Sequence, residues 1–198
     1  KSSFNNMARF ILIDNIENLN KNSVNALLKV IEEPNENIFF ILINNNEKYI
    51  LPTLKSRCLT FKIYLTFDQS MNVSNQLLNA NLFDLINHDL ISYYNTPGEI
   101  INLFNFSKDK SLDLRDYTLI NFLNLLIDNG YYKKNKLVKN LLVNFIELFF
   151  LKEYRLNSSR KSLIKIYQNF VAKIYNTEKF NLDEESVFLE FKSKLLNG

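Results

Sequence analysis

The chain has 198 residues, of which 46% are hydrophobic and 14% aromatic, so it can form a core and is not a disordered tail. Its net charge of +3 is low for a protein that holds DNA by itself, and its lysines are scattered. The single cysteine, Cys58, excludes an internal disulfide, and with the single histidine, His88, it excludes a Cys/His zinc site within this chain. This composition suits a reducing cytoplasm, and no apolar run is long enough to resemble a membrane span.

The first part of the chain, to about Tyr64, has the pattern strand, helix, strand. Phe10–Ile13 and Ile38–Ile43 are short, continuous apolar runs, as expected of strands buried on both faces of a parallel sheet. Between them, Asn20 is expected to cap a helix with apolar residues at helical spacing, and Pro34 to end it. These elements predict one βαβ unit with a right-handed connection.

From Phe67 onward the chain shows only helical periodicity. Helices are predicted at 68–78 and 83–94, and a third begins at Thr96-Pro-Gly-Glu99, a capping box with Pro at the first helical position. Four longer helices follow a polar linker at 107–111, and the second of them, at about 134–155, is expected to lie centrally because it is apolar over most of its circumference. The predicted core positions of the whole chain include Leu12, Leu28, Phe40, Leu42, Leu123, Leu142 and Phe170.

No self-contained active site is visible in the sequence. The three glycines cannot form a GxxxxGK[ST] phosphate loop or a Gly-rich dinucleotide loop. One cysteine and one histidine in different zones do not indicate a nucleophile pair. We therefore predict that this chain binds no cofactor or metal of its own and is not an enzyme by itself.

Asp14 directly follows the first apolar strand. In a P-loop ATPase, a carboxylate at that place would hold Mg²⁺ at the carboxyl edge of the sheet. Taken alone, the residue is more simply an aspartate that ends a strand.

Two further stretches favour the ATPase interpretation of Asp14 over a simple strand end. They are Asn25-Ala-Leu-Leu-Lys-Val-Ile-Glu-Glu-Pro34 and Leu51-Pro-Thr-Leu-Lys-Ser-Arg-Cys58. Together with Phe10-Ile-Leu-Ile-Asp14, and in the same order and spacing, they closely resemble the clamp-loader branch of the AAA+ ATPases. The resemblance is dense over about 9–61 and weak beyond, and the Ser-Arg-Cys triplet is its most specific part.

The resemblance implies a fold that is α/β and then all-α. Residues 1–66 would be the C-terminal part of an AAA+ parallel-sheet domain, 67–108 a helical lid of three helices, and 109–198 a helical collar through which subunits assemble into a ring. Because the first apolar strand has no sheet before it, we expect an N-terminal part of the protein to be missing from this chain.

Ser56-Arg57-Cys58 is similar to the family motif in which the arginine reaches across an interface to the ATP of a neighbouring subunit. A planar, permanently charged guanidinium suits that role, because it can meet the charge that develops on the γ-phosphoryl group. The resemblance thus makes Arg57 an arginine finger in trans, with Ser56 and Cys58 as its motif neighbours. Cys58 would be a small packed residue and not a nucleophile.

Departures from the family pattern indicate the type of subunit. An active ATPase subunit would carry Asp-Glu after the first strand, whereas this chain has Asp14-Asn15, and an amide cannot act as the base. Gly98 stands where an active subunit has an arginine for its own nucleotide. Retaining Arg57 while lacking these residues resembles the delta-prime type of clamp-loader subunit, a stationary ring member.

That type implies hetero-oligomeric partners: the gamma/tau and delta subunits, the sliding clamp indirectly, and primer-template DNA weakly or through the complex. The only nucleotide would be the ATP-Mg of the neighbouring subunit. Two alternatives stay open. One is an active gamma/tau-type ATPase subunit; the other is a helical DNA-binding module with an AAA+ remnant, which predicts steeply salt-dependent DNA binding.

Overall fold

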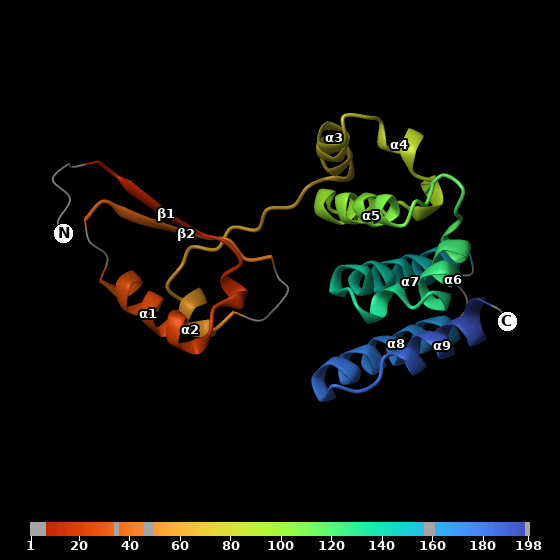
Figure 1. The fold of residues 1–198 in the computed structure, drawn as a ribbon. Coiled ribbons are helices and arrows are strands. Elements are labelled where there is room, and N and C mark those ends of the chain that lie inside the picture. Colours follow the sequence, from red (N-terminus) through yellow and green to blue (C-terminus); the bar gives the residue numbers. More distant parts are fainter. Residues whose placement is uncertain (1–6, 34–35, 46–49, 157–160, 197–198) are drawn as a thin grey trace. The chain divides into compact units, whose positions relative to one another are not determined.

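The computed structural model describes residues 7–33, 36–45, 50–156 and 161–196. The chain divides into two compact units, Lys1–Tyr64 and Leu65–Gly198, shown in Figure 1. The first unit contains a small sheet with helices, and the second is helical throughout its described part. Within the described ranges, no helix is long and apolar enough to cross a membrane.

The first unit is a βαβ arrangement, as predicted. Its elements are β1 (Arg9–Ile13), the 3₁₀ turn η1 (Ile16–Asn18), α1 (Lys21–Glu32), β2 (Ile38–Leu42) and α2 (Pro52–Lys55). The strands are parallel, with Arg9 opposite Ile38 and Ile13 opposite Leu42. The predicted cap is confirmed: the Asn20 side chain accepts a hydrogen bond of 2.8 Å from the Ser23 backbone N–H. Pro34, expected to end this helix, lies outside the described residues.

A small core holds this unit together. Ile16, Val24 and Leu54 are buried, and α1 packs with them against one face of the sheet. The prediction that both strands are buried on both faces is wrong within this unit, because none of its described elements covers the other face. There Leu12 is 62% exposed, against the prediction that it belongs to the core, and Phe10 stacks on Phe39 at 5.4 Å. The other expected core positions of this unit, Leu28, Phe40 and Leu42, are partly buried.

The second unit stacks its helices in layers (Figure 1). The first layer contains α3 (Phe67–Leu78), α4 (Leu82–Leu85), the 3₁₀ turn η2 (His88–Leu90) and α5 (Pro97–Asp109). The second contains α6 (Leu119–Asp128), the 3₁₀ turn η3 (Tyr131–Lys133) and α7 (Lys136–Leu156), and the third contains α8 (Lys161–Phe180), α9 (Glu185–Phe191) and the π-helical turn η4 (Lys192–Leu196). The capping box at Thr96 is confirmed, since its hydroxyl accepts from the Glu99 N–H at 3.3 Å and Glu99 Oε2 accepts from the Thr96 N–H at 2.9 Å.

One predicted helix and one predicted linker differ from the structure. The helix expected at 83–94 is broken into α4 and η2, because Ile86 is extended and the Asn87 N–H donates to the Leu114 carbonyl at 3.1 Å instead of continuing a helix. The polar linker expected at 107–111 begins later, since α5 continues to Asp109 and Ser107 is buried with its hydroxyl bonded to the Phe104 carbonyl.

Helix α7 lies centrally, as its pattern predicts, in contact with α5, α6 and α8. The buried residues of one continuous apolar core come from α3 through α9, and the predicted core positions Leu123, Leu142 and Phe170 are all part of it. Phe122 is its aromatic centre, in contact with Phe145 at 5.3 Å between ring centroids. The helices of this unit therefore share one core and form one compact body.

Asp89 joins three elements of this body. Its Oδ2 accepts from the Leu119 backbone N–H at 2.6 Å, at the start of α6, and its Oδ1 forms an ion pair with Lys152 of α7. Partial burial acts to raise the pKa of Asp89, but the hydrogen bond from Leu119 and the ion pair with Lys152 together lower it below the ordinary value of 3.8. The carboxylate form is therefore favoured in the folded state.

We expect Asp89→Asn to lower the free energy of unfolding by about 1–2 kcal/mol at pH 7, because a charge-assisted bond is lost at a partly exposed site. A carboxyl whose folded pKa is lowered contributes stability above its unfolded pKa and loses that contribution as pH falls through its folded pKa. The difference between the two proteins should shrink below about pH 4. Urea unfolding at pH 7 and pH 3 measures this, with the exposed Asp84→Asn on α4 as control. An equal difference at both pH values would contradict it.

Candidate functional site

Arg57 follows a short helix that is anchored in the core of the first unit. Pro52 at the first helical position favours the helical backbone there, and Leu54 is 2% exposed. The helix ends at once: the Ser56 N–H donates to the Pro52 carbonyl at 2.9 Å, and the Arg57 N–H to the Leu54 carbonyl at 3.2 Å. Anchoring of Leu54 thus fixes the backbone from which the Arg57 side chain starts.

Two contacts hold the Arg57 guanidinium. Nη1 donates to the Thr53 carbonyl at 2.9 Å, and Nη2 lies 2.5 Å from Oε1 of Glu32, the last residue of α1. The Arg57 side chain nevertheless keeps 39% of its surface exposed, so a molecule outside this chain can reach it. A guanidinium has five N–H donors, and these two contacts leave several of them available.

Ser56 and Cys58 flank Arg57, and neither side chain contributes a charge to the site. Ser56 Oγ donates to the same Thr53 carbonyl at 3.1 Å, which tightens the turn below Arg57. Cys58 is partly buried against the small core, and its burial raises the pKa of the thiol above the ordinary value of 9.0. A thiol of raised pKa is mostly protonated at neutral pH and is a poor nucleophile.

Asp14 and Asn15 lie at the carboxyl edge of the sheet, directly after β1. Asn15 has a left-handed backbone with φ 53, which asparagine tolerates better than most residues. Its backbone N–H and its Nδ2 each donate to the Asp14 carboxylate at 2.9 Å, and its Oδ1 accepts from Asn45 Nδ2 at 2.5 Å. The Asn15 amide is thus bonded on both sides and has no basic lone pair with which to activate a water.

Glu17 at the same edge was not singled out in the sequence. It is 8% exposed, its Oε1 accepts from the Asn45 N–H at 3.3 Å, and its Oε2 has no hydrogen-bond partner among the described residues. No group of three or more His, Cys, Asp or Glu side chains that could hold a metal ion occurs in the described ranges. A glutamate in a strand-to-helix connection is usually exposed. The sequence pattern therefore gave no indication that Glu17 is buried.

Gly98 belongs to the second unit, where it is the second residue of α5. A Cβ at this position would meet no atom within 4 Å, so packing within this unit does not require a glycine there. The structure thus brings Ser56, Arg57 and Cys58 together at one place and Asp14 and Asn15 at another, while Gly98 lies on a separate unit.

The Arg57 guanidinium and the carboxyl edge lie at opposite ends of α1. Because β1 and β2 are parallel, the connecting helix α1 runs back against them, as Figure 1 shows. Its first turn follows the Asp14–Asn15 edge, and its last residue, Glu32, holds Arg57. Twelve helical residues span about 18 Å. Among the described residues, no hydrogen bond or ion pair joins Arg57 to Asp14 or Asn15 at the edge where open α/β sheets bind their own ligands.

Comparisons with known proteins agree with the sequence resemblance. The family model described as DNA polymerase III, delta subunit, matches residues 1–66. Over 189 residues, 87% of the chain, the sequence is 31% identical to DNA polymerase III subunit delta' of Buchnera aphidicola subsp. Schizaphis graminum, of which it covers 55%. It is 30% identical over 172 residues, 82% of the chain, to the gamma subunit of the same organism, of which it covers 42%.

A shorter match, 42% identical over 50 residues, is found with DNA polymerase III subunit delta' of Pseudomonas aeruginosa; it covers 25% of this chain and 15% of that relative. The chain spans about half the length of the curated relative that it matches over the longest stretch. The family model covers the residues that hold Arg57 and the Asp14–Asn15 edge. The family model and the long delta' match together support a protein of the clamp-loader delta-prime family of DNA polymerase III.

Proposed function

We propose that this chain acts in a clamp loader as a delta-prime subunit, a stationary ring member that supplies Arg57 to the ATP of a neighbouring subunit. The observation that carries the proposal is the Arg57 guanidinium, held by α1 and α2 yet 39% exposed, at the end of α1 opposite to the chain's own carboxyl edge. A guanidinium so placed can serve a nucleotide bound to another subunit more readily than one bound to its own. The charge that develops on a transferring γ-phosphoryl group is the chemistry it would stabilise.

The carboxyl edge supports the second half of the proposal, that this subunit hydrolyses no ATP. Asn15 stands where a catalytic glutamate is expected, and both polar atoms of its amide are engaged by Asp14 and Asn45. The cofactor of the reaction would be the ATP-Mg of the neighbouring subunit. Ser56 and Cys58 would set the turn that presents Arg57, without taking part in the chemistry.

The helical unit fits a ring member that does not move internally. We propose that 67–108 form the lid and 109–198 the collar, and that the collar contacts the gamma/tau and delta subunits. The continuous core from α3 to α9 supports a stationary role, because lid and collar would then move as one body. Contact with the sliding clamp would be indirect, and contact with primer-template DNA would be weak or made through the assembled complex.

A second candidate function is that of an active gamma/tau-type ATPase subunit. The match to a gamma subunit over 82% of the chain favours it. The two candidates differ in what the complete subunit does with nucleotide when it is alone.

We expect the complete subunit, purified alone, to show no ATP hydrolysis above a blank, because Asn15 cannot act as a base. Hydrolysis is measured by phosphate release and ATP binding by fluorescence anisotropy of a labelled ATP analogue, with a gamma subunit as positive control. Hydrolysis that is lost on Asp14→Asn would contradict the delta-prime assignment and favour the gamma/tau type.

A further inference from the structure

The last residue of α1, Glu32, stands where a carboxylate is electrostatically unfavourable. The C-terminal end of a helix carries a partial negative charge from its unpaired carbonyl groups, and acidic side chains are disfavoured there. Glu33 follows immediately, so two carboxylates lie at the negative end of the same helix. The Arg57 guanidinium, 2.5 Å from Glu32 Oε1, is the cation that compensates Glu32.

The two groups that hold Arg57 come from different elements of the fold. Glu32 belongs to the end of α1, and the Thr53 carbonyl to the first turn of α2, and α1 and α2 are in contact. Contacts on Nη1 and on Nη2 restrict both the position of the guanidinium and the orientation of its plane. The Nε–H makes no hydrogen bond to a described residue, and the side chain is 39% exposed. The Arg57 guanidinium is thus already oriented within this chain, without a neighbouring subunit.

We propose that Glu32 is a positioning residue for Arg57: it orients the guanidinium so that its unpaired N–H donors face the γ-phosphate of the neighbouring subunit's ATP. This inference rests on the proposed function, because it needs Arg57 to act in trans. Glu32 itself touches no substrate. Its contribution is preorganisation, since a donor that is already oriented needs no reorganisation when charge develops in the transition state.

The exposure of the pair argues that its effect lies in the rate rather than in stability. The Arg57 and Glu32 side chains are 39% and 46% exposed, and ion pairs at such exposure contribute little to the stability of a fold. Residues that orient a catalytic group from behind, in contrast, typically change activity about 10–100-fold when they are removed.

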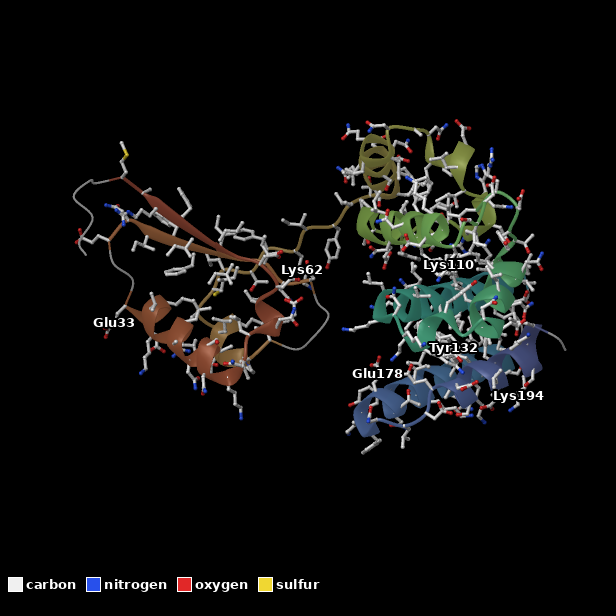
Figure 2. The ribbon with its side chains drawn as sticks, in the orientation of Figure 1. Glu33, Lys62, Lys110, Tyr132, Glu178 and Lys194 are labelled. Carbon is white, nitrogen blue, oxygen red and sulfur yellow. The ribbon has the colours of Figure 1, made fainter. Side chains whose placement is uncertain are left out.

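The test uses the complete subunit assembled with its motor and delta subunits, clamp and primed DNA. Single-turnover ATP hydrolysis is measured for wild type, Glu32→Gln, Glu32→Asp, Arg57→Ala and the double variant Glu32→Gln/Arg57→Ala. Glu33→Gln is the matched control, because Glu33 is the adjacent carboxylate, is exposed, and has no ion pair among the described residues (Figure 2 shows it at the end of α1). Ring assembly and thermal unfolding are recorded for every variant.

We expect Glu32→Gln to slow the hydrolysis phase that depends on Arg57 by about 10–100-fold, with assembly and melting temperature unchanged. Glu32→Asp should retain more of the rate than Glu32→Gln, because charge rather than length holds the guanidinium. Glu33→Gln should match wild type. In the Arg57→Ala background, Glu32→Gln should cause no further loss, since two residues that act through one group are not additive.

The outcomes separate this inference from the function on which it rests. If Arg57→Ala leaves the time course unchanged, the trans role itself is wrong. If Arg57→Ala removes the phase but Glu32→Gln behaves as wild type, the trans role stands and the positioning role is wrong. A loss on Glu32→Gln that is equally large in the Arg57→Ala background would also overturn the positioning role, because Glu32 would then act by another route.

Discussion

Replacing Arg57 by alanine in the complete subunit is expected to remove one fast phase of single-turnover ATP hydrolysis from the assembled clamp loader. Arginine fingers that act in trans contribute on the order of 10³–10⁵ in rate in GTPase systems, and Arg57 is held by Glu32 and the Thr53 carbonyl while 39% of its side chain stays exposed. Single-turnover measurement is needed because, in steady state, intact sites elsewhere in the ring would mask one damaged site.

Lys55→Ala is the matched control for this result. Lys55 is an exposed cation at the end of α2, two residues before Arg57, so it tests whether any loss of positive charge at this surface has the same effect. We expect its time course to equal that of wild type. An unchanged time course for Arg57→Ala, with the ring assembled, would reduce Arg57 to a surface residue and this subunit to a structural member of the ring.

The largest effect on stability is expected from Leu142→Ala in the middle of α7. Leu142 is 0% exposed and belongs to the core that joins α3 to α9. Replacing a fully buried leucine by alanine removes apolar contacts and leaves a cavity, which costs about 2–5 kcal/mol of unfolding free energy. For a chain of this size the melting temperature should fall by roughly 5–15 °C. Urea and thermal unfolding followed by circular dichroism measure both quantities.

Leu137→Ala provides the control on the same helix. Leu137 lies in the first turn of α7 and is 54% exposed, so the same chemical change should alter the unfolding free energy by less than about 0.5 kcal/mol. Equal losses for Leu142→Ala and Leu137→Ala would mean that α7 does not lie centrally in the core.

Local patterns predicted the elements of this protein well. The strands β1 and β2 follow from continuous apolar runs, and the central position of α7 follows from apolar residues over most of its circumference. The caps at Asn20 and Thr96 follow from residue types that bond the free N–H groups at helix starts. These features depend on neighbours within a few residues, which a single sequence displays directly.

Features that depend on distant parts of the chain were not predictable in the same way. The predicted helix at 83–94 is interrupted because the Asn87 N–H bonds to Leu114, a residue 27 positions later. The predicted burial of Leu12 is wrong because an apolar strand sequence indicates that both faces of the strand can be buried. It does not indicate whether another element packs on each face.

The same limit applies to the candidate site. Its motif marked Arg57, but the pairing of Arg57 with Glu32 and the burial of Glu17 require the folded βαβ unit. Glu32 could be read only as part of a motif, since an exposed glutamate at a helix end carries no pattern that names its partner. The sequence therefore marked Arg57 as a candidate, but it did not indicate the contacts that hold its side chain.

A structure of the assembled loader with an ATP transition-state mimic would test whether Arg57 completes a nucleotide site on another subunit. The measured quantity is the distance from the Arg57 guanidinium to the γ-phosphate position of the neighbouring subunit. We predict a hydrogen-bond distance of about 3 Å, with Glu32 still in contact with Arg57. A guanidinium that lies beyond contact with every nucleotide in the ring would rule out a role of Arg57 in trans.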